Sequence, residues 1–398
     1  MSTCLVSPAS ADQYHYENML IGDRASGMAG AYSAISDDTS GIYYNPAGTV
    51  YAEGGSVSGS MNTFHRTFTE YEDVLGSGGS WKRQSSAIVP NYFGFLQPLG
   101  GGVVGFSYAV TDSIQEDQDQ LFRNIVVDTP GGSIDIDRYY INFNNQDNTY
   151  KIGPSYAARL TDEFSVGITL YGYFRSQELI LNQQIYYANN ATQWTNQYFE
   201  INETGYEPVL GLIWSPFNKF SFGMSVRKTM ILSSFARTQT TVDDKPSDPS
   251  LGVRLNFPSV GTTTKPRDYP VNVRTGVAYF ANTKLLVSGD VSYYTETDSR
   301  ASITNFALGS EYYFAKNWAS RFGVYSNYAN TPTGGSLDHT DLYGLSLSGS
   351  RFTRNTSVTL GFNYSTGTGE AQVVAGTSNK QDMNMSTFTV FLSAMYSN

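Results

Sequence analysis

The chain has 398 residues, a formal net charge of -10 and 15% charged residues, where an ordinary soluble domain has roughly 25%. Its 30 Tyr and 23 Phe argue against disorder, its single Cys excludes a disulfide framework or a zinc ribbon, and its acidic balance argues against a nucleic-acid partner. No run approaches the roughly 18 apolar residues of a membrane helix, so a helical transporter is excluded as well. The composition leaves a large all-β chain.

Residues 1–11 are expected to be the remnant of a signal peptide. Pro8 and the small residues that follow it up to Ala11 resemble the cleaved end of a secretory signal. The basic start and the full apolar core of such a signal are missing, so the alternative is a true start further upstream. Cys4 lacks the apolar and small residues of a lipoprotein box before it, and we expect no lipid there.

Residues 12–50 form a separate segment, because they lack the alternation of the rest of the chain. Small residues crowd between Gly22 and Ala34, which allows close packing of the backbone against other surfaces. The segment continues with Asp37-Asp38 and then Asn45-Pro46-Ala47. Pro46 fixes its own φ and favours an extended Asn45. These features fit two hypotheses equally: a plug in the lumen of a barrel, or a short periplasmic helix that caps its mouth.

From about residue 54 onward, apolar and polar residues alternate with a period of two. Val358, Leu360 and Phe362, for example, alternate with small and polar residues, which gives a strand one apolar and one polar face. The pattern predicts fourteen strands, at residues 54–68, 84–97, 102–112, 148–160, 163–178, 203–215, 218–235, 269–281, 283–296, 302–315, 317–328, 341–353, 355–368 and 384–396.

Three features favour a transmembrane barrel over a soluble sandwich. Many of the predicted strands have ten residues or more, which a tilted strand needs to cross a bilayer. Tyr and Phe concentrate near strand ends, and short connections alternate with long ones, of which residues 113–147, 179–202 and 236–268 are the longest. We therefore predict an all-β fold, with residues 51–398 forming an antiparallel β-barrel in the bacterial outer membrane. An even number of strands places both of its ends in the periplasm.

Residues 22–48, with the sequence GDRASGMAGAYSAISDDTSGIYYNPAG, resemble the N-terminal hatch of the FadL family of outer-membrane transporters for long-chain fatty acids and hydrocarbons. The resemblance implies a fourteen-stranded barrel with a lumenal hatch that contains short helix. It also implies release of the ligand through a lateral gap at an inward kink in the third strand, where Gly105 is a candidate kink point. The PorV/PorQ-type proteins, which serve secretion and surface attachment, have a similar N-terminal segment and are the second possibility.

The resemblance implies passive uptake of hydrophobic small molecules such as long-chain fatty acids. A secretion or surface-attachment partner on the same scaffold is the alternative. No catalytic constellation, metal site or cofactor motif stands out around His15, His65 or His339, so an enzyme is not expected. The expected partners are the ligand, membrane lipid, lipopolysaccharide and the barrel assembly machinery, and the chain is expected to be a monomer.

The alternation places Arg227, Arg274 and Arg321 on inward faces of their strands. A charge in a narrow lumen needs a partner, because its desolvation alone costs several kcal/mol, as an order of magnitude. We therefore predict that Asp37 or Asp38 pairs with a lumenal arginine, preferably Arg274 or Arg321. The alternative is that the two aspartates end the small-residue helix in periplasmic water.

Overall fold

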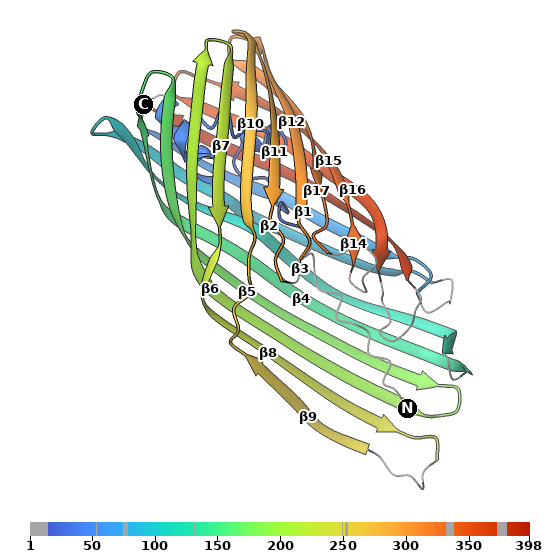
Figure 1. Cartoon of the computed structure of the whole chain (residues 1–398). Helices are drawn as coiled ribbons and strands as arrows, with labels where there is room; N and C mark the ends of the chain where they lie inside the picture. Colours follow the sequence, from blue (N-terminus) through green and yellow to red (C-terminus); the bar gives the residue numbers. More distant parts are fainter. Residues whose placement is uncertain are drawn as a thin grey trace.

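The computed structural model describes residues 15–52, 54–74, 79–129, 132–248, 250, 254–298, 300–331, 338–371 and 380–398. The expected signal-peptide remnant at residues 1–11 lies outside the described residues. Strands dominate, and they form a single antiparallel sheet that closes on itself, because β1 pairs with both β2 and β17. Figure 1 shows the closed end of this sheet at the top and a long extension towards the lower right.

The strands run in chain order around the barrel. They are β1 (Ser56–Tyr71), β2 (Trp81–Leu99), β3 (Gly102–Thr129), β4 (Gly132–Arg159), β5 (Phe164–Tyr187), β6 (Thr192–Phe217), β7 (Phe220–Lys228), β8 (Met230–Lys245), β9 (Arg254–Thr263), β10 (Val271–Asn282), β11 (Leu285–Tyr294), β12 (Ile303–Ala315), β13 (Trp318–Asn327), β14 (His339–Thr340), β15 (Leu342–Phe352), β16 (Thr356–Ala371) and β17 (Gln381–Ser397).

Fourteen strands make up the barrel wall, as the alternation predicted. β7 and β8 are one wall strand interrupted at Thr229, and β14 and β15 are another interrupted at Asp341. β9 lies at the end of the strand order beside β8 and takes no part in the closed wall. Each of the fourteen predicted strands overlaps one of these wall strands, so the fold prediction is confirmed.

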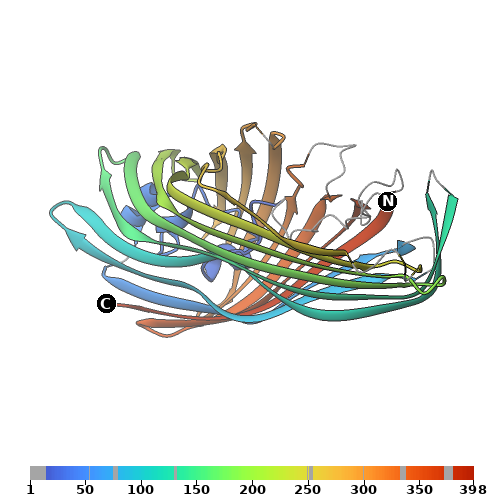
Figure 2. The same ribbon diagram turned by 90° about the horizontal axis from the view of Figure 1, so that it is seen from below.

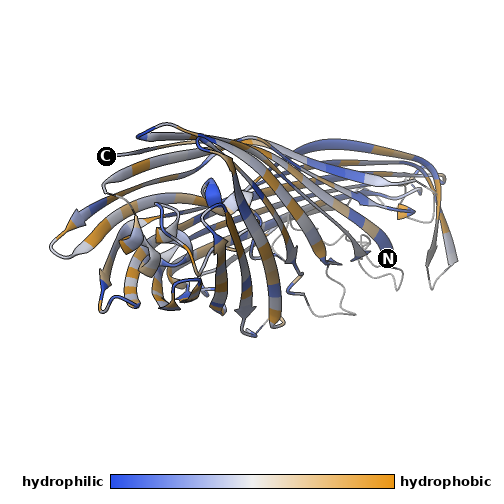
Figure 3. Ribbon diagram, turned by 90° about the horizontal axis from the view of Figure 1, so that it is seen from above, coloured by the Kyte–Doolittle hydropathy of each residue, from blue (hydrophilic) through white to orange (hydrophobic). Residues whose placement is uncertain are grey.

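The outside of the barrel carries an apolar belt. On β16, Val358, Leu360, Phe362 and Tyr364 are exposed, while Thr359 between them is buried in the lumen. Figure 3 shows the resulting alternation of hydrophobic and hydrophilic bands along the strands. An outward apolar face with a polar lumen is the pattern of a barrel that is embedded in lipid.

Several strands continue far beyond this belt on one side only. β3 and β4 each have 28 residues, or about 90 Å at the usual rise per residue, whereas crossing a bilayer takes roughly 9–11 residues. Together with the outer parts of β5 and β6, and with β8 and β9, they form what we call the extension (Figure 2). The prediction that residues 113–147, 179–202 and 236–268 are mainly loops was therefore wrong. The strands continue to pair through their backbones there, but their outward side chains are polar. The alternation of apolar and polar residues that was used to recognise strands is therefore missing in this part.

The extension meets the ends of β1, β2 and β17 at a cluster of buried apolar side chains, called here the extension cluster. Its members include Tyr71, Trp81, Phe143, Leu179, Leu181 and Met383. These side chains come from the inward faces of the extended strands. The cluster therefore packs one face of the extension against the rim of the barrel and leaves the other face to its surroundings.

The N-terminal segment lies inside the barrel as a hatch. It contains α1 (Arg24–Gly27), α2 (Gly41–Tyr44) and the 3-10 helix η1 (Pro46–Tyr51), which Figure 2 shows in blue within the curve of the sheet. Asp23 caps α1 with its side chain, and Asn45 caps η1 with Pro46 at the first helical turn. Within the described residues, no helix is long and apolar enough to cross a membrane.

Candidate functional site

Asn45 joins the hatch to the wall. Its side-chain Oδ1 accepts a hydrogen bond from the Ala47 amide at 3.2 Å, and its Nδ2 donates to the carbonyl oxygen of Ser33 at 2.7 Å. The same Nδ2 donates to the carbonyl oxygen of Leu212 on β6 at 2.9 Å. Asn45 is fully buried, so each of these bonds replaces one that water would make in the unfolded chain.

Glycines on the wall give the Asn45-Pro46-Ala47 motif its space. A Cβ atom at Gly211 would lie 2.1 Å from Asn45 Oδ1, and one at Gly167 would lie 2.5 Å from the carbonyl carbon of Pro46. Both distances are too short for a side chain, so only glycine allows this close approach. These residues were missed by the sequence reasoning. The available signal was a glycine at an inward position in an otherwise apolar strand.

Hydroxyl groups on neighbouring strands bind backbone carbonyl oxygens of the hatch. Ser165 Oγ donates to Ala47 at 2.9 Å, Thr169 Oγ1 donates to Ile42 at 2.9 Å, and Ser221 Oγ donates to Ala34 at 2.7 Å. The short helices of the hatch cannot pair all of their own carbonyl groups. Small hydroxyl side chains of the wall donate hydrogen bonds to these carbonyls instead.

Asp37 pairs with Arg24 in the hatch itself. The Arg24 Nη1 lies 2.5 Å from Asp37 Oδ1, and its Nη2 lies 2.6 Å from Glu311 Oε2 on β12. Glu311 Oε1 also accepts from Arg321 Nε at 2.7 Å. Asp37 is therefore linked to Arg321 through Arg24 and Glu311, in place of the expected direct pair. The reason is that Glu311, which is completely buried, already neutralises Arg321.

Asp38 turns back into the hatch. Its Oδ1 accepts from the backbone N of Ser40 at 2.8 Å and from Ser40 Oγ at 2.5 Å. The expected pairing of Asp38 with a lumenal arginine is replaced by this local turn. Burial, together with the nearby charges of Asp23 and Asp37, raises the pKa of Asp38 to about 6. Its charged form is therefore less favourable in the hatch than it is in water.

The remaining two arginines of the prediction contact the N-terminal segment directly. Arg274 Nη2 lies 2.5 Å from Glu17 Oε1, and its Nη1 donates to the carbonyl oxygen of Gly30 at 3.4 Å. Arg227 Nη2 donates to the carbonyl oxygen of Tyr43 at 2.5 Å, and its guanidinium lies over the Tyr43 ring at 4.6 Å from the centroid. Both therefore hold the hatch by its backbone and by ring contacts.

Asp290 on β11 is a further hatch contact, and the sequence analysis did not identify it. Its Oδ2 accepts from the backbone N of Tyr32 at 3.2 Å and of Ser33 at 3.0 Å, and from Ser33 Oγ at 2.6 Å. A buried wall carboxylate thus satisfies two amides of the hatch that have no helix to pair within. Nothing in the sequence separated Asp290 from other inward acids.

A cavity of about 160 Å³ remains beside the hatch, between Tyr43 and the strands around β4 to β10. Its lining is polar and mainly basic. The basic side chains are Lys151, Arg175, Arg227, Lys228, Arg267 and Arg274, and the acidic ones are Glu17, Asp112 and Glu207. Most of this positive charge is already paired, because Arg175 contacts Asp147 and Glu203, Arg267 contacts Glu203, Lys228 contacts Asp268, and Arg274 contacts Glu17. Lys151 and Arg227 share the carboxylate of Glu207, at 2.8 and 3.9 Å, so among the lining residues the excess of positive charge lies beside these two.

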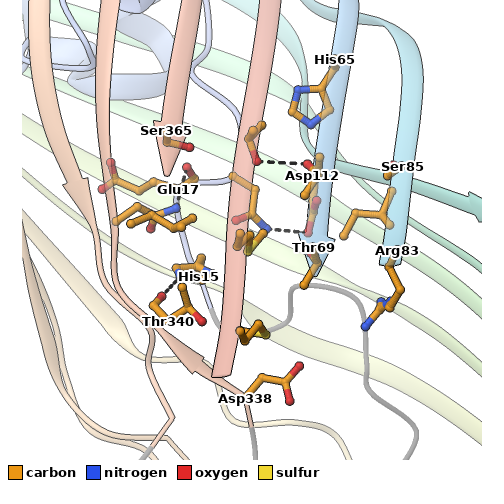
Figure 4. Close-up of a pocket in the computed structure, with 18 of the residues that line it drawn as sticks. His15, Glu17, His65, Thr69, Arg83, Ser85, Asp112, Asp338, Thr340 and Ser365 are labelled. Atoms are coloured by element: carbon orange, nitrogen blue, oxygen red, sulfur yellow. Dashed lines mark hydrogen bonds between the residues drawn. The ribbon is translucent and has the colours of Figure 1, made fainter. Parts of the chain in front are cut away.

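A smaller cavity of about 60 Å³ lies on the other side of residues 15–18 and is mainly acidic. Figure 4 shows His15, Glu17, Arg83, Asp112 and Asp338 around it. His15 Nε2 lies 2.8 Å from the carbonyl oxygen of Thr340, a contact drawn in the figure. His15, Glu17 and Asn18 of the N-terminal segment and Asp112 of β3 line both cavities, so the two cavities lie side by side.

The wall beside both cavities is interrupted between β2 and β3. The two strands pair at Ser85 with Glu116 and again from Tyr92 with Ala109 onward, but the pairs between these points are missing although residues 86–91 and 110–115 are described. Pro90 in this stretch of β2 has no N–H to donate. Opposite it, the pairing of β3 with β4 shifts between Val110 and Asp112, which marks a β-bulge.

Gly105, the candidate kink point, lies outside this interruption. It pairs with Leu96 on β2 and with Ser155 on β4 in an unbroken register. A Cβ atom there would lie 2.8 Å from Ile42 Cδ1 of the hatch. In this position Gly105 makes room for the hatch, while the irregularity of the third strand lies at Thr111.

The histidines bring no metal or catalytic group together. His65 Nδ1 lies 2.8 Å from Thr389 Oγ1, and His339 Nδ1 lies 3.0 Å from the carbonyl oxygen of Thr331. Within the part of the chain that the structure describes, no group of three or more His, Cys, Asp or Glu side chains is placed to hold a metal ion.

No protein-family model matches the sequence, and a search of curated proteins gives no match either. Solved structures do match the fold over almost the whole chain. A FadL homologue from Pseudomonas aeruginosa has a TM-score of 0.68 and 14% identity, covering 95% of this chain and 99% of its own. The toluene transporter TodX from P. putida has a TM-score of 0.65 and 13% identity, covering 94% and 97%.

The toluene transporter TbuX from Ralstonia pickettii matches in the same way, with a TM-score of 0.64, 15% identity and coverage of 95% and 98%. At these identities the likeness concerns the fold. The chain therefore has the fold of FadL-type channels, a closed fourteen-stranded barrel, as the resemblance of residues 22–48 predicted.

Proposed function

We propose that the chain is an outer-membrane channel for the passive uptake of hydrophobic small molecules that carry an anionic head group, such as long-chain fatty acids. One observation carries the proposal: the ladder between β2 and β3 is interrupted at residues 86–91 and 110–115, and Asp112 in this stretch lines both lumenal cavities. A ligand in the lumen thus lies beside the weakest part of the wall, where missing backbone pairs lower the cost of opening towards the lipid.

The extension cluster is the apolar part of the proposed route. Phe143, Leu179 and Leu181 pack there against Trp81 at the rim, and Met383 lines both this cluster and the smaller cavity. These side chains are buried against one another in this conformation, so an acyl chain would replace part of that packing when the extension separates from the rim. The polar lumen below would then receive the head group.

The excess of positive charge at Lys151 and Arg227 in the larger cavity favours a carboxylate head group. Lys151 and Arg227 both face Glu207, at 2.8 and 3.9 Å, and one carboxylate shared by two cations leaves positive charge for a ligand. Replacing both cations, as in Lys151→Gln with Arg227→Gln, should weaken the binding of oleate about tenfold or more and leave the binding of an uncharged alkane unchanged. Equal loss for both ligands would assign the two residues to structure instead.

A disulfide across the interruption tests the lateral route. In a Cys4→Ser background, Ala87→Cys and Ile114→Cys place two thiols on the inward face where the ladder would continue. Oxidation should stop the uptake of labelled oleate into cells and reduction should restore it. The matched control is Gln97→Cys with Val104→Cys, which joins the same strands where they already pair. Uptake that persists in the oxidised Ala87/Ile114 variant would reject this route.

Thiol labelling on intact cells tests the location. Ala188→Cys lies at the tip of the hairpin between β5 and β6, and Asp162→Cys lies in the short turn between β4 and β5. Because long connections of outer-membrane barrels face outward, a membrane-impermeant reagent should label residue 188 and spare residue 162. The opposite pattern would invert the proposed orientation.

A role as a secretion or surface-attachment partner is the alternative, and the extension is the observation that favours it. Its edge strand β9 pairs with β8 and offers its other edge to a partner. Removing residues 238–263 should leave oleate uptake unchanged if the chain is a channel. If the truncated chain still takes up oleate but cells lose a surface-attached protein, both roles are supported. If cells lose that protein and the full chain takes up no ligand either, the alternative alone is favoured.

A further inference from the structure

The extension has a second face that the channel does not use. On β4 the side chains of Tyr139, Ile141 and Phe143 point inward and are buried. The residues between them point outward, on the same face that carries exposed Ile152 and Tyr156 nearer the barrel. Because the alternation is continuous from Tyr139 to Ala157, the outward face of this part of the extension is the direct continuation of the lipid-facing belt.

Beyond the belt this face becomes rich in amide side chains. Asn142, Asn144 and Gln146 follow one another on β4, and β5 and β6 add Asn182, Gln184 and Asn196. We call these six residues the amide face. Asn142 pairs with Asn182 and Asn182 pairs with Asn196, so three asparagines form one row across three strands. Neighbouring strands lie about 4.8 Å apart, so the row presents evenly spaced amides.

Acidic and aromatic side chains order the amides. Asn142 Nδ2 donates to Asp119 Oδ1 at 2.7 Å, which extends the row onto β3. Trp194 Nε1 donates to Asn182 Oδ1 at 2.9 Å, and Trp194 pairs with Gln184 across β5 and β6. An ordered face reduces the entropy that binding would otherwise cost.

This combination matches the chemistry of a sugar ring. Each amide offers both donors and an acceptor, as neighbouring hydroxyl groups require, and carboxylates accept from further hydroxyls. Tyr and Trp rings add an apolar surface with a polar edge, which suits the alternating C–H and O–H groups of a saccharide. Lipid tails would bury little apolar area here, because Ile180 is an isolated apolar residue among Asn144, Tyr198 and their polar neighbours.

The charge of the face selects among saccharides. Asp117, Asp119, Glu178 and Glu200 point outward with the amides, and Arg237 beside Glu200 is a cation on the same face. Arg138, which lies over the Tyr186 ring, and Arg123 opposite it add two cations beyond the row of asparagines. Around the row itself carboxylates exceed cations, and they repel phosphate and uronate groups. The face therefore suits a neutral saccharide and disfavours a phosphorylated one.

We propose that the amide face binds the neutral saccharide chains of glycolipids in the surrounding outer leaflet. Its position decides the source: it begins where the lipid-facing belt ends, at the height of the sugars that a lipid anchor carries. Binding there would hold the extension against the sugar layer and keep its inner face, with the extension cluster, above the barrel mouth. The inference does not depend on which small molecule the channel carries.

Titration of the purified full chain in detergent tests the proposal. The probe is the oligosaccharide released by mild acid from the host's own lipopolysaccharide and then dephosphorylated. The wild-type chain should bind it, and the triple variant Asn142→Ala, Asn182→Ala, Asn196→Ala should bind at least tenfold more weakly. The matched control is Asn218→Ala with Asn317→Ala, two exposed asparagines in turns far from this face, and it should bind as the wild type does.

Trp194 gives a second readout. Its fluorescence should change on addition of the oligosaccharide in the wild type and the control, and the saccharide-dependent change should vanish in Trp194→Phe. Absence of binding by the wild-type chain, equal binding by the triple variant, or binding restricted to the phosphorylated oligosaccharide would each overturn the proposal. Capture of a protein on this face without saccharide binding would overturn it too.

Discussion

Asn45 of the hatch donates a hydrogen bond to the carbonyl oxygen of Leu212 on β6 at 2.9 Å. The two residues lie 167 positions apart, so this bond forms only when the hatch occupies the closed barrel. It meets the wall opposite Gly211, whose missing side chain makes the approach possible. The position of the hatch is therefore set by the hydrogen bond of the Asn45 amide to β6 and by the space that Gly211 leaves for it.

Asn45→Ala should loosen the hatch. The change removes two donated bonds and one accepted bond from a buried position, and each such bond is worth about 1 kcal/mol. We expect the docking of the hatch to weaken by about 2–3 kcal/mol and the conductance of single channels in planar bilayers to rise. Asn218→Ala in an exposed turn is the control and should leave conductance as it is. A variant at Asn45 with wild-type conductance would show that small-residue packing alone holds the hatch.

Gly211→Ala should have a similar effect from the opposite side. The added methyl group would lie 2.1 Å from Asn45 Oδ1 and 2.8 Å from Pro46 Cδ, and the chain must move to relieve this overlap. Overpacking of this kind costs about 1–3 kcal/mol. Hydrogen exchange of the hatch amides measures it. Gly349→Ala, on a strand position with nothing within 4 Å, should exchange as the wild type does; faster exchange in both variants would point to a general effect on the strands.

Glu311 should be the most sensitive charge in the lumen. Its removal in Glu311→Ala leaves Arg24 and Arg321 buried without their shared carboxylate, which costs about 3–5 kcal/mol. In a double-mutant cycle, Arg24→Ala and Glu311→Ala should be coupled by about 0.5–3 kcal/mol. Asp38→Ala and Arg274→Ala, whose side chains bind Ser40 and Glu17 instead of each other, should be additive. Coupling in the second cycle would restore the direct pair predicted from the sequence.

Docking of the hatch should depend on pH through Asp38. Its pKa is raised from 3.8 to about 6 by burial and by neighbouring aspartates, so the folded hatch binds a proton more tightly than the undocked one. The stabilisation is complete below about pH 4, falls as the pH rises from about 4 to about 6, and then stays constant, with a total change on the order of 3 kcal/mol. Asp38→Asn keeps the acceptor for Ser40 and removes the charge. Conductance measured from about pH 4 to pH 7 should rise in the wild type and stay flat in the variant; a flat wild-type profile would exclude Asp38 as its source.

The sequence by itself determined the wall and the identity of the hatch. Alternation over residues 54–396 predicted fourteen strands because a strand between lipid and a polar lumen must place apolar residues at every second position. The hatch was implied by the resemblance of residues 22–48 to the hatch of FadL-type transporters, whereas the residues alone fitted a plug and a periplasmic cap equally. Both signals are local, so they can be seen without knowing what lies opposite.

Tertiary structure alone decided which groups meet. Asp37 pairs with Arg24, and not with an arginine of the wall, because Arg321 is already paired with Glu311. The spacing of residues in the sequence carries no information on which of two carboxylates an arginine contacts. The length of β3 to β6 escaped detection because the extension's outward face is polar, so its strands lack the apolar period by which the wall was recognised. The interruption between β2 and β3 depends on backbone pairs between two strands, and pairing becomes visible only when the sheet is closed.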